Sequence, residues 1–152
     1  KIPVVPISTL KSLAYNLPYC SHTIVPIMDA RREQVYNGVY KWENEELCTI
    51  KEPRALGIVE LLDELVKNEG KFVFLGDGTK VHKEIIKEKL GEKAIFSPSS
   101  SALQRASTLA PIAKRVYDEG GSITGAKLEP EYLRKSQAER EAENKEKLKG
   151  DN

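Results

Sequence analysis

The chain has 152 residues, of which 39% are hydrophobic and 31% are charged, so it can bury one core and has the usual size of a single domain. Its 24 basic and 23 acidic residues leave a net charge of +1, so no excess of positive charge would recruit nucleic acid by releasing counterions. No run approaches the roughly eighteen apolar residues that a membrane-spanning helix needs, which excludes membrane insertion. Cys20 and Cys48 have no paired spacing and no signal segment is recognisable, so we expect reduced thiols and a cytoplasmic location.

The first part of the chain predicts one short helix and then three strands. Ser8 has the side chain of a helix N-cap, and Pro18 would end the helix. The apolar residues between them recur at helical spacing: Leu10, Leu13, Ala14 and Leu17. Strand-like runs follow at about 23–29, 34–41 and 46–51. The short polar links between these runs favour antiparallel hairpins.

The rest of the sequence alternates helices and strands. An apolar stripe predicts a helix over 58–66 that ends near Gly70, and further helices are expected at about 79–90 and 102–119. Strands are expected at Phe72–Leu75 and Ala94–Phe96, and the first is apolar on both faces, as an interior strand would be. Each later strand must return through a crossover. The sequence therefore predicts an α/β fold of the ribonuclease-H-like type, whose mixed sheet has three antiparallel strands followed by alternating helices and strands.

A charged turn follows the first predicted strand of the sheet. Asp29, Arg31 and Arg32 would lie close together there, at the end of an apolar strand. One interpretation is that they contact a ligand or a partner; the other is that Asp29 accepts hydrogen bonds from the turn backbone and from an arginine, which would fix the hairpin. Tyr36, on the next strand, is expected to pack against the sheet.

The segment Gly76-Asp77-Gly78-Thr79 follows a buried strand and opens a helix. Backbone N–H groups at a helix N-terminus can bind a phosphate, so the segment is a candidate for a vestigial nucleotide loop. It has neither of the glycine-rich phosphate-binding patterns, and the same residues suit a plain turn in which Asp77 or Thr79 caps the helix. An Asp77 carboxylate beside a phosphate would be repulsive unless a metal ion intervened.

The sequence contains no recognisable catalytic or metal-binding pattern. His22 and His82 are sixty positions apart, and each is expected at the surface or at a helix end. The serines of 97–101 lack the Gly-x-Ser-x-Gly pattern of a nucleophile elbow and are expected to cap a helix. We therefore predict no catalytic residue and no metal site in this chain.

Two segments resemble motifs of the TsaB (YeaZ) family. The first runs from Val25 to Tyr40 and includes Asp29-Ala30-Arg31-Arg32, and the second is Leu128-Glu129-Pro130-Glu131-Tyr132-Leu133-Arg134. In the second, Tyr132 and Leu133 are expected to bury against the domain while Arg134 pairs at its rim, although contact with a partner is an alternative. The resemblance covers almost the whole chain.

The resemblance implies a non-catalytic scaffold. Members of this family support the enzyme TsaD in transferring a threonylcarbamoyl group to adenosine in tRNA, so the implied partners are TsaD and TsaE, with a homodimer as a competing state. ATP and metal would then belong to the partner enzyme, and tRNA would be met only through the complex. The alternative is an ATP-binding or glycoprotease-like enzyme of the same superfamily. A separate RNA-binding module is a weaker alternative, because the charge is balanced.

The sequence predicts four regions: an opening segment with a helix over 1–22, a ribonuclease-H-like lobe over 23–126, a terminal strap over 127–136, and a charged tail over 137–152. The tail has few apolar residues after Leu133 and is expected to be frayed or disordered, with a docking helix as the alternative. No part of the sequence matches the earlier lobe of the family. We therefore expect the chain to be the C-terminal lobe of a two-lobed protein.

Overall fold

The computed structural model describes residues 2–130 and residue 133. Its strands are β1 (Pro3–Val4), β2 (Thr23–Asp29), β3 (Gln34–Glu43), β4 (Glu46–Gly57), β5 (Phe72–Leu75), β6 (Ala94–Phe96) and β7 (Ile123–Thr124). Its α-helices are α1 (Thr9–Ala14), α2 (Ile58–Val66), α3 (Gly78–Leu90) and α4 (Ala106–Asp118). Short 3-10 turns occupy Gly91–Lys93, Ser99–Ser101 and Gly125–Lys127.

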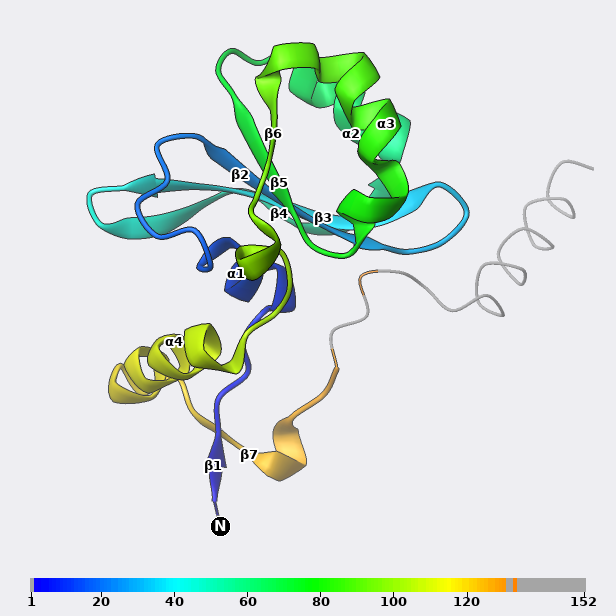
Figure 1. The fold of residues 1–152 in the computed structure, drawn as a ribbon. Coiled ribbons are helices and arrows are strands. Elements are labelled where there is room, and N and C mark those ends of the chain that lie inside the picture. Colours follow the sequence, from blue (N-terminus) through cyan, green and yellow to red (C-terminus); the bar gives the residue numbers. More distant parts are fainter. Residues whose placement is uncertain (1, 131–132, 134–152) are drawn as a thin grey trace, which may run out of the picture.

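The main sheet has five strands in the order β4-β3-β2-β5-β6 (Figure 1). Strands β2, β3 and β4 are joined by antiparallel hairpins, whereas β5 runs parallel to β2 and β6 runs parallel to β5. All four residues of β5 are buried, which confirms the prediction of an interior strand. This is the predicted α/β, ribonuclease-H-like lobe, and its mixed sheet follows from three consecutive hairpin strands and two later crossovers.

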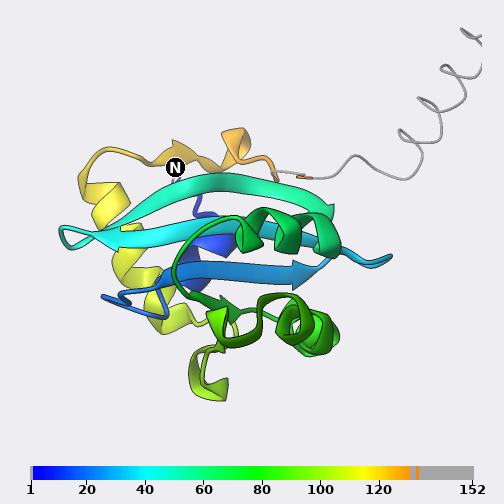
Figure 2. The ribbon, with the colours of Figure 1, turned by 90° about the horizontal axis from the view of Figure 1, so that it is seen from above.

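Helices cover both faces of this sheet. Helices α2 and α3 lie over one face, and α1 and α4 lie on the other side (Figures 1 and 2). Under α2 and α3, the larger core contains Val25, Ile27, Val35, Leu56, Ile58, Leu61, Leu62, Leu65, Phe72, Phe74, Ile86 and Leu90. Each fully buried aliphatic or aromatic side chain in it contributes roughly 1.5–3 kcal/mol relative to exposure, so this face carries much of the stability.

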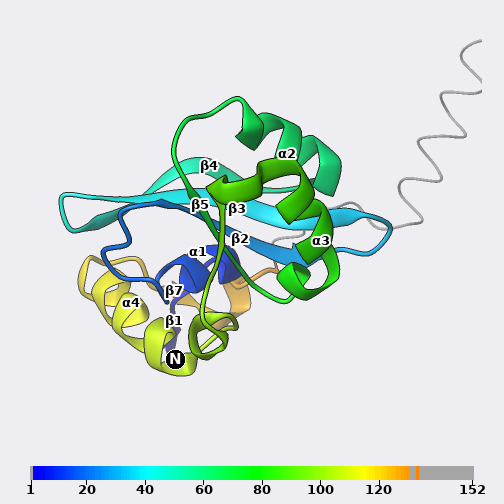
Figure 3. The ribbon, with the colours of Figure 1, turned by 45° about the horizontal axis from the view of Figure 1, so that its top comes forward.

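Helix α1 packs on the opposite face (Figure 3) and begins as predicted. The Ser8 hydroxyl accepts a hydrogen bond from the Lys11 backbone N–H at 3.4 Å. The helix ends at Ala14, earlier than Pro18. After Ala14 the backbone forms hydrogen bonds between residues three apart, from Asn16 N to Leu13 O (2.9 Å) and from Leu17 N to Ala14 O (3.2 Å). The apolar face therefore extends beyond the regular helix.

Strand β2 contains a proline although it lies inside the sheet. Pro26 has no N–H to donate, and the neighbouring β3 is irregular between Asn37 and Tyr40. The Asn37 side chain is fully buried, and its Nδ2 donates to Pro26 O (3.2 Å) and to Gly38 O (2.8 Å). A side-chain amide thus replaces a missing ladder hydrogen bond at the centre of the sheet.

The C-terminal part differs most from the prediction. Helix α4 begins at Ala106 rather than near 102, because the Ala102 carbonyl accepts a hydrogen bond from Gly76 N (2.7 Å) and Arg105 has an extended backbone. The serines of 97–101 form a 3-10 turn over Ser99–Ser101 and do not cap α4, so that prediction is wrong. Only Ile112 of α4 is buried. The rest of α4 is therefore exposed or half-buried.

A second, two-stranded sheet was not predicted. In it, β1 pairs antiparallel with β7, with Pro3 opposite Thr124 and Val4 opposite Ile123, apart from the main sheet (Figure 1). Two-residue strands are too short to produce a recognisable alternation of apolar and polar residues. This sheet joins the start of the described chain to the segment after α4.

Candidate functional site

The Asp29 turn is held by backbone contacts. Asp29 is the last residue of β2, and its Oδ1 accepts a hydrogen bond from the Arg31 backbone N–H at 3.1 Å. Ala30 N donates to Gln34 O (2.9 Å), which closes the turn. The expected bond from the turn backbone is therefore confirmed. Within the described residues neither arginine side chain pairs with Asp29, so the expected bond from a guanidinium is wrong.

The tip of this turn has an unusual backbone. Arg31, Arg32 and Glu33 have φ angles of 60°, 54° and 58°, so three consecutive non-glycine residues are left-handed. Glu33 O accepts from Ile58 N (2.8 Å), which ties the tip to the first residue of α2. All three side chains are exposed. The turn therefore presents two guanidinium groups on a strained but anchored backbone.

The loop at Gly76–Thr79 packs against the end of β2. Gly76 has a φ of 99°, and a Cβ atom there would lie 2.1 Å from Ile27 O. At Gly78, a Cβ atom would lie 3.1 Å from the same oxygen and 3.2 Å from Asp29 N. The close approach of the loop to β2 thus requires glycine at 76 and leaves little room for a side chain at 78, which is a structural reason for this motif independent of any ligand.

Neither predicted capping side chain caps α3. Asp77 has a helical backbone conformation, whereas an N-cap side chain bonds best from an extended one, and its Oδ1 accepts from Asp29 N at 3.2 Å. The Thr79 hydroxyl donates to Gly76 O at 2.7 Å. The prediction of a cap by either residue is therefore wrong. Asp77 links the loop to the charged turn, 48 positions earlier in the sequence.

His82 belongs to the same cluster. Its residue surface is only 7% exposed and its Nε2 has no hydrogen-bond partner, but it lies 3.7 Å from Asp29 Oδ1. The prediction of a surface histidine is wrong, because His82 lies on the buried face of α3 with Gly78, Ile86 and Leu90. The four-residue spacing of these residues was a signal that could have found it. The other histidine, His22, is half-buried before β2.

Tyr36 and Leu133 come together elsewhere. Both line a cavity of about 680 Å³, which also has Leu10, Met28, Pro53 and Leu128 in its wall. Both pack against the core under α1, as partly buried side chains. Tyr132 and Arg134, together with the segment 137–152, lie outside the described residues. The structure thus brings Asp29 and the Gly76–Thr79 loop together at one edge of the sheet and places Tyr36 and Leu133 at a separate cavity.

The described residues contain no group of three or more His, Cys, Asp or Glu side chains that could hold a metal ion. Likewise, no helix in this part of the chain is long and apolar enough to cross a membrane. Cys20 and Cys48 are free and half-buried. The groups available at the candidate site are two carboxylates, one buried imidazole, two guanidiniums and the N-terminus of α3, an arrangement that can position a backbone or contact a charged partner.

Comparisons with known proteins identify the family. Residues 1–142 match the family model described as TsaD, tRNA N6-adenosine threonylcarbamoyltransferase. A curated relative, the tRNA threonylcarbamoyladenosine biosynthesis protein TsaB of Bacillus subtilis (strain 168), is 34% identical over 138 residues; these are 91% of this chain and 58% of the relative. The chain therefore spans little more than half the length of that relative.

Two solved structures share the fold. One is YeaZ from Pseudomonas aeruginosa, with a TM-score of 0.67 and 22% identity over 86% of this chain and 59% of that one. The other, from the same organism, is described as an uncharacterized protein with similarity to peptidase YEAZ and has a TM-score of 0.65 and 20% identity over 87% and 59% of the two chains. The two structures show the shared fold. The match to the family model and the Bacillus subtilis relative show that the chain belongs to the family described as TsaD, tRNA N6-adenosine threonylcarbamoyltransferase, as a member of its TsaB (YeaZ) group.

Proposed function

We propose that this chain is a non-catalytic partner of TsaD in the transfer of a threonylcarbamoyl group to adenosine of tRNA. Membership of the TsaB (YeaZ) group supports a role in threonylcarbamoyladenosine biosynthesis. The chain spans 58% of the Bacillus subtilis relative, so the activity, substrates and partners of the whole protein enter here as parts of the proposal.

One observation carries the non-catalytic part of the proposal: the contact between Asp77 and the end of β2. A phosphate at the N-terminus of α3 would meet the Asp77 carboxylate, whose Oδ1 accepts from Asp29 N at 3.2 Å. The Asp29 carboxylate lies at the same edge of the sheet. Two negative charges disfavour an anion where the helix dipole alone would attract it. In this proposal ATP and metal belong to the partner enzyme, and this chain holds no cofactor.

The exposed tip with Arg31 and Arg32 is the part of the candidate site best suited to contact a partner. Its backbone is fixed by the Glu33–Ile58 hydrogen bond, so its guanidiniums lose less freedom on binding than they would on a loose loop. TsaE is a second partner in this proposal, and a homodimer competes with both. In this proposal the complex works in the cytoplasm. It binds tRNA through its other subunits, because the net charge of +1 on this chain offers little attraction for RNA.

Light-scattering chromatography tests the proposal. TsaD from the same organism is mixed with this chain, and we expect a complex whose mass is the sum of the two. Replacing both tip arginines (Arg31→Ala with Arg32→Ala) should weaken the complex. Arg105→Ala, an exposed arginine at the start of α4, is the matched control and should leave it intact. The absence of a joint peak for the unaltered chain would overturn the proposed partnership.

ATP hydrolysis tests the non-catalytic role separately. The purified chain should hydrolyse ATP far more slowly than about 1 per second, the lower end for ordinary enzymes. A rate above that level, unaffected by further purification but lost in Asp77→Ala, would assign the chemistry to this chain and reject the scaffold role. This outcome is independent of whether TsaD binds.

A further inference from the structure

Tyr19 is an exposed aromatic residue held in a costly backbone conformation. It has a φ of 54° in the turn that Cys20 N closes onto Leu17 O (3.3 Å), and it is 69% exposed. A left-handed backbone costs a residue with a side chain roughly 1–2 kcal/mol. Burial does not offset this cost, since most of the ring faces solvent. Strain of this kind is a feature of sites that contact other molecules.

Tyr19 belongs to an aromatic patch, which we define as Tyr15, Tyr19 and Trp42. The centroid of the Trp42 ring lies 5.3 Å from that of the Tyr19 ring and 5.4 Å from that of the Tyr15 ring. The contact between Trp42 and Tyr15 is edge-to-face. Trp42 Nε1 donates to Leu17 O (2.8 Å), so the same residue fixes the turn that presents Tyr19. Arg115 of α4 donates a hydrogen bond to the Tyr15 hydroxyl (2.7 Å), and its guanidinium lies over the Tyr15 ring. Tyr19 remains the most open member of the patch.

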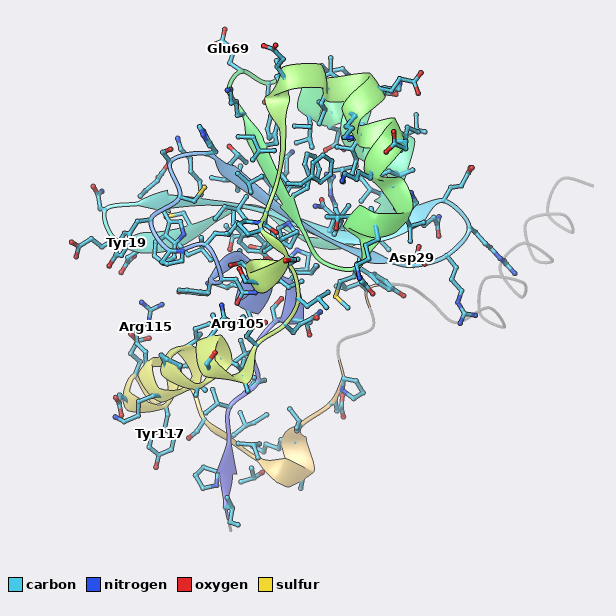
Figure 4. All side chains as sticks on the ribbon, in the orientation of Figure 1. Tyr19, Asp29, Glu69, Arg105, Arg115 and Tyr117 are labelled. Carbon is cyan, nitrogen blue, oxygen red and sulfur yellow. The ribbon has the colours of Figure 1, made fainter. Side chains whose placement is uncertain are left out.

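The hairpin that follows Trp42 in the sequence is acidic, whereas Arg115 lies against Tyr15. The hairpin that joins β3 to β4 follows Trp42 and carries Glu43 at the end of β3, Glu45 in the turn and Glu46 at the start of β4, all exposed. Of these three glutamates only Glu43 forms an ion pair within the described residues, with Lys41 at 3.8 Å. Figure 4 shows Tyr19 at the end of the sheet where this turn lies, opposite the end that carries Asp29. The patch is thus separate from the candidate site.

We propose that the aromatic patch and its acidic turn bind a protein segment that carries arginine or lysine. A cation can lie on the open face of Tyr19 while the unpaired glutamates attract its charge. Tyrosine and tryptophan are also the residues that contribute most at protein interfaces. The three glutamates that follow Trp42 in the sequence disfavour RNA, although its bases could stack on Tyr19. This inference goes beyond the proposed function and does not depend on TsaD.

Trp42 provides a direct assay because it is the only tryptophan of the chain. A synthetic oligo-arginine peptide is titrated into the full chain while Trp42 fluorescence is followed, with an oligo-glutamate peptide and a single-stranded RNA of equal length as the other probes. We expect a saturable change with the cationic peptide alone, which weakens as salt is added. The double substitution Glu45→Gln with Glu46→Gln should reduce both the affinity and its dependence on salt.

Substitutions at Tyr19 identify the binding surface. Tyr19→Gly removes the ring and relieves the backbone strain, so it should fold and yet bind the peptide about two- to fivefold more weakly, as expected for an exposed cation–π contact. Tyr19→Phe keeps the ring and should bind normally. Tyr117→Ala on α4 and Glu69→Gln after α2 (Figure 4) remove an exposed ring and an exposed carboxylate elsewhere and should have no effect.

Three results would overturn the proposal. The first is equal binding of the cationic peptide by Tyr19→Gly and the unaltered chain, and the second is tighter binding of RNA than of the peptide. The third is a change in Trp42 fluorescence on raising the concentration of the protein alone, together with a doubled mass, which would assign the patch to a second copy. Failure of the peptide to bind while TsaD still co-elutes would reject this inference and leave the proposed function intact.

Discussion

Replacing Gly76 by alanine tests whether the loop at Gly76–Thr79 is built for packing against β2. Gly76 has a φ of 99°, and an added Cβ atom would lie 2.1 Å from Ile27 O. Gly70, before β5, is a matched control because its φ is 91° and an added Cβ atom would have no neighbour within 4 Å. Both substitutions impose alanine on a left-handed backbone, and only the first adds a steric overlap.

The two costs can be separated. The left-handed backbone should cost each variant about 1–2 kcal/mol, reduced somewhat because alanine also restricts the unfolded chain. At Gly76 the overlap is with a backbone oxygen of an interior strand, so either the loop or β2 must move. Overpacking of a well-packed core adds about 1–3 kcal/mol. We expect Gly76→Ala to lose at least about 1 kcal/mol more than Gly70→Ala.

Urea unfolding of the two variants measures this difference. The free energy of unfolding in water is obtained for each from the linear dependence on denaturant, with circular dichroism as the signal. Equal losses would mean that the loop relaxes away from Ile27 at no cost, and the argument that packing requires this glycine would be refuted. If Gly76→Ala does not fold, Gly78→Ala is compared with the unaltered chain instead, because its contacts are longer, at 3.1–3.2 Å, and its backbone is not left-handed.

Three further substitutions test other parts of the structure. The Arg54 hydrogen bond lowers the pKa of Glu64 below its ordinary 4.5. The pair therefore stabilises the fold above that pH, and this contribution is lost as the pH falls through the lowered pKa. When the free energy of unfolding is measured as a function of pH in acid, Glu64→Gln should remove this part of the decline. Asn37→Ala should lose about 1–3 kcal/mol in urea unfolding, because it removes the donor to Pro26 O from a buried site, and no loss would mean that the amide is dispensable. His82→Phe should leave the midpoint of thermal unfolding unchanged or higher, because the buried Nε2 makes no hydrogen bond. A clear fall would show that its 3.7 Å contact with Asp29 Oδ1 matters more.

The sheet could be predicted because its order depends on local patterns. Short polar links fix the hairpins of β2, β3 and β4, and the apolar run Phe72–Leu75 marks an interior strand. Burial of α4 could not be predicted in the same way. Its apolar residues have helical spacing, but only Ile112 is buried, because the helix packs mainly against the short α1 and not against the sheet. Spacing identifies a face and does not show what covers it.

The candidate site was predicted in pieces and not as a unit. Asp29 and the Gly76–Thr79 loop were each recognised from their position at the end of a strand. Their contact depends on the parallel pairing of β2 with β5, in which Pro26 is opposite Leu75. A lone histidine carries no signal of burial by itself, and only its four-residue spacing with Gly78, Ile86 and Leu90 indicates the buried face of α3.

The parallel pairing also limits what the site can do. Because β2 and β5 end at the same edge, the residues after them must meet there, and the Asp77 carboxylate accepts from Asp29 N while Gly76 packs on Ile27. A phosphate at the N-terminus of α3 would have to approach this carboxylate, and a Cβ-bearing residue at Gly76 would disturb β2. A protein partner that contacts Arg31 and Arg32 at the exposed tip would require neither change. The geometry therefore favours recognition at the outer surface of this edge over nucleotide chemistry inside it.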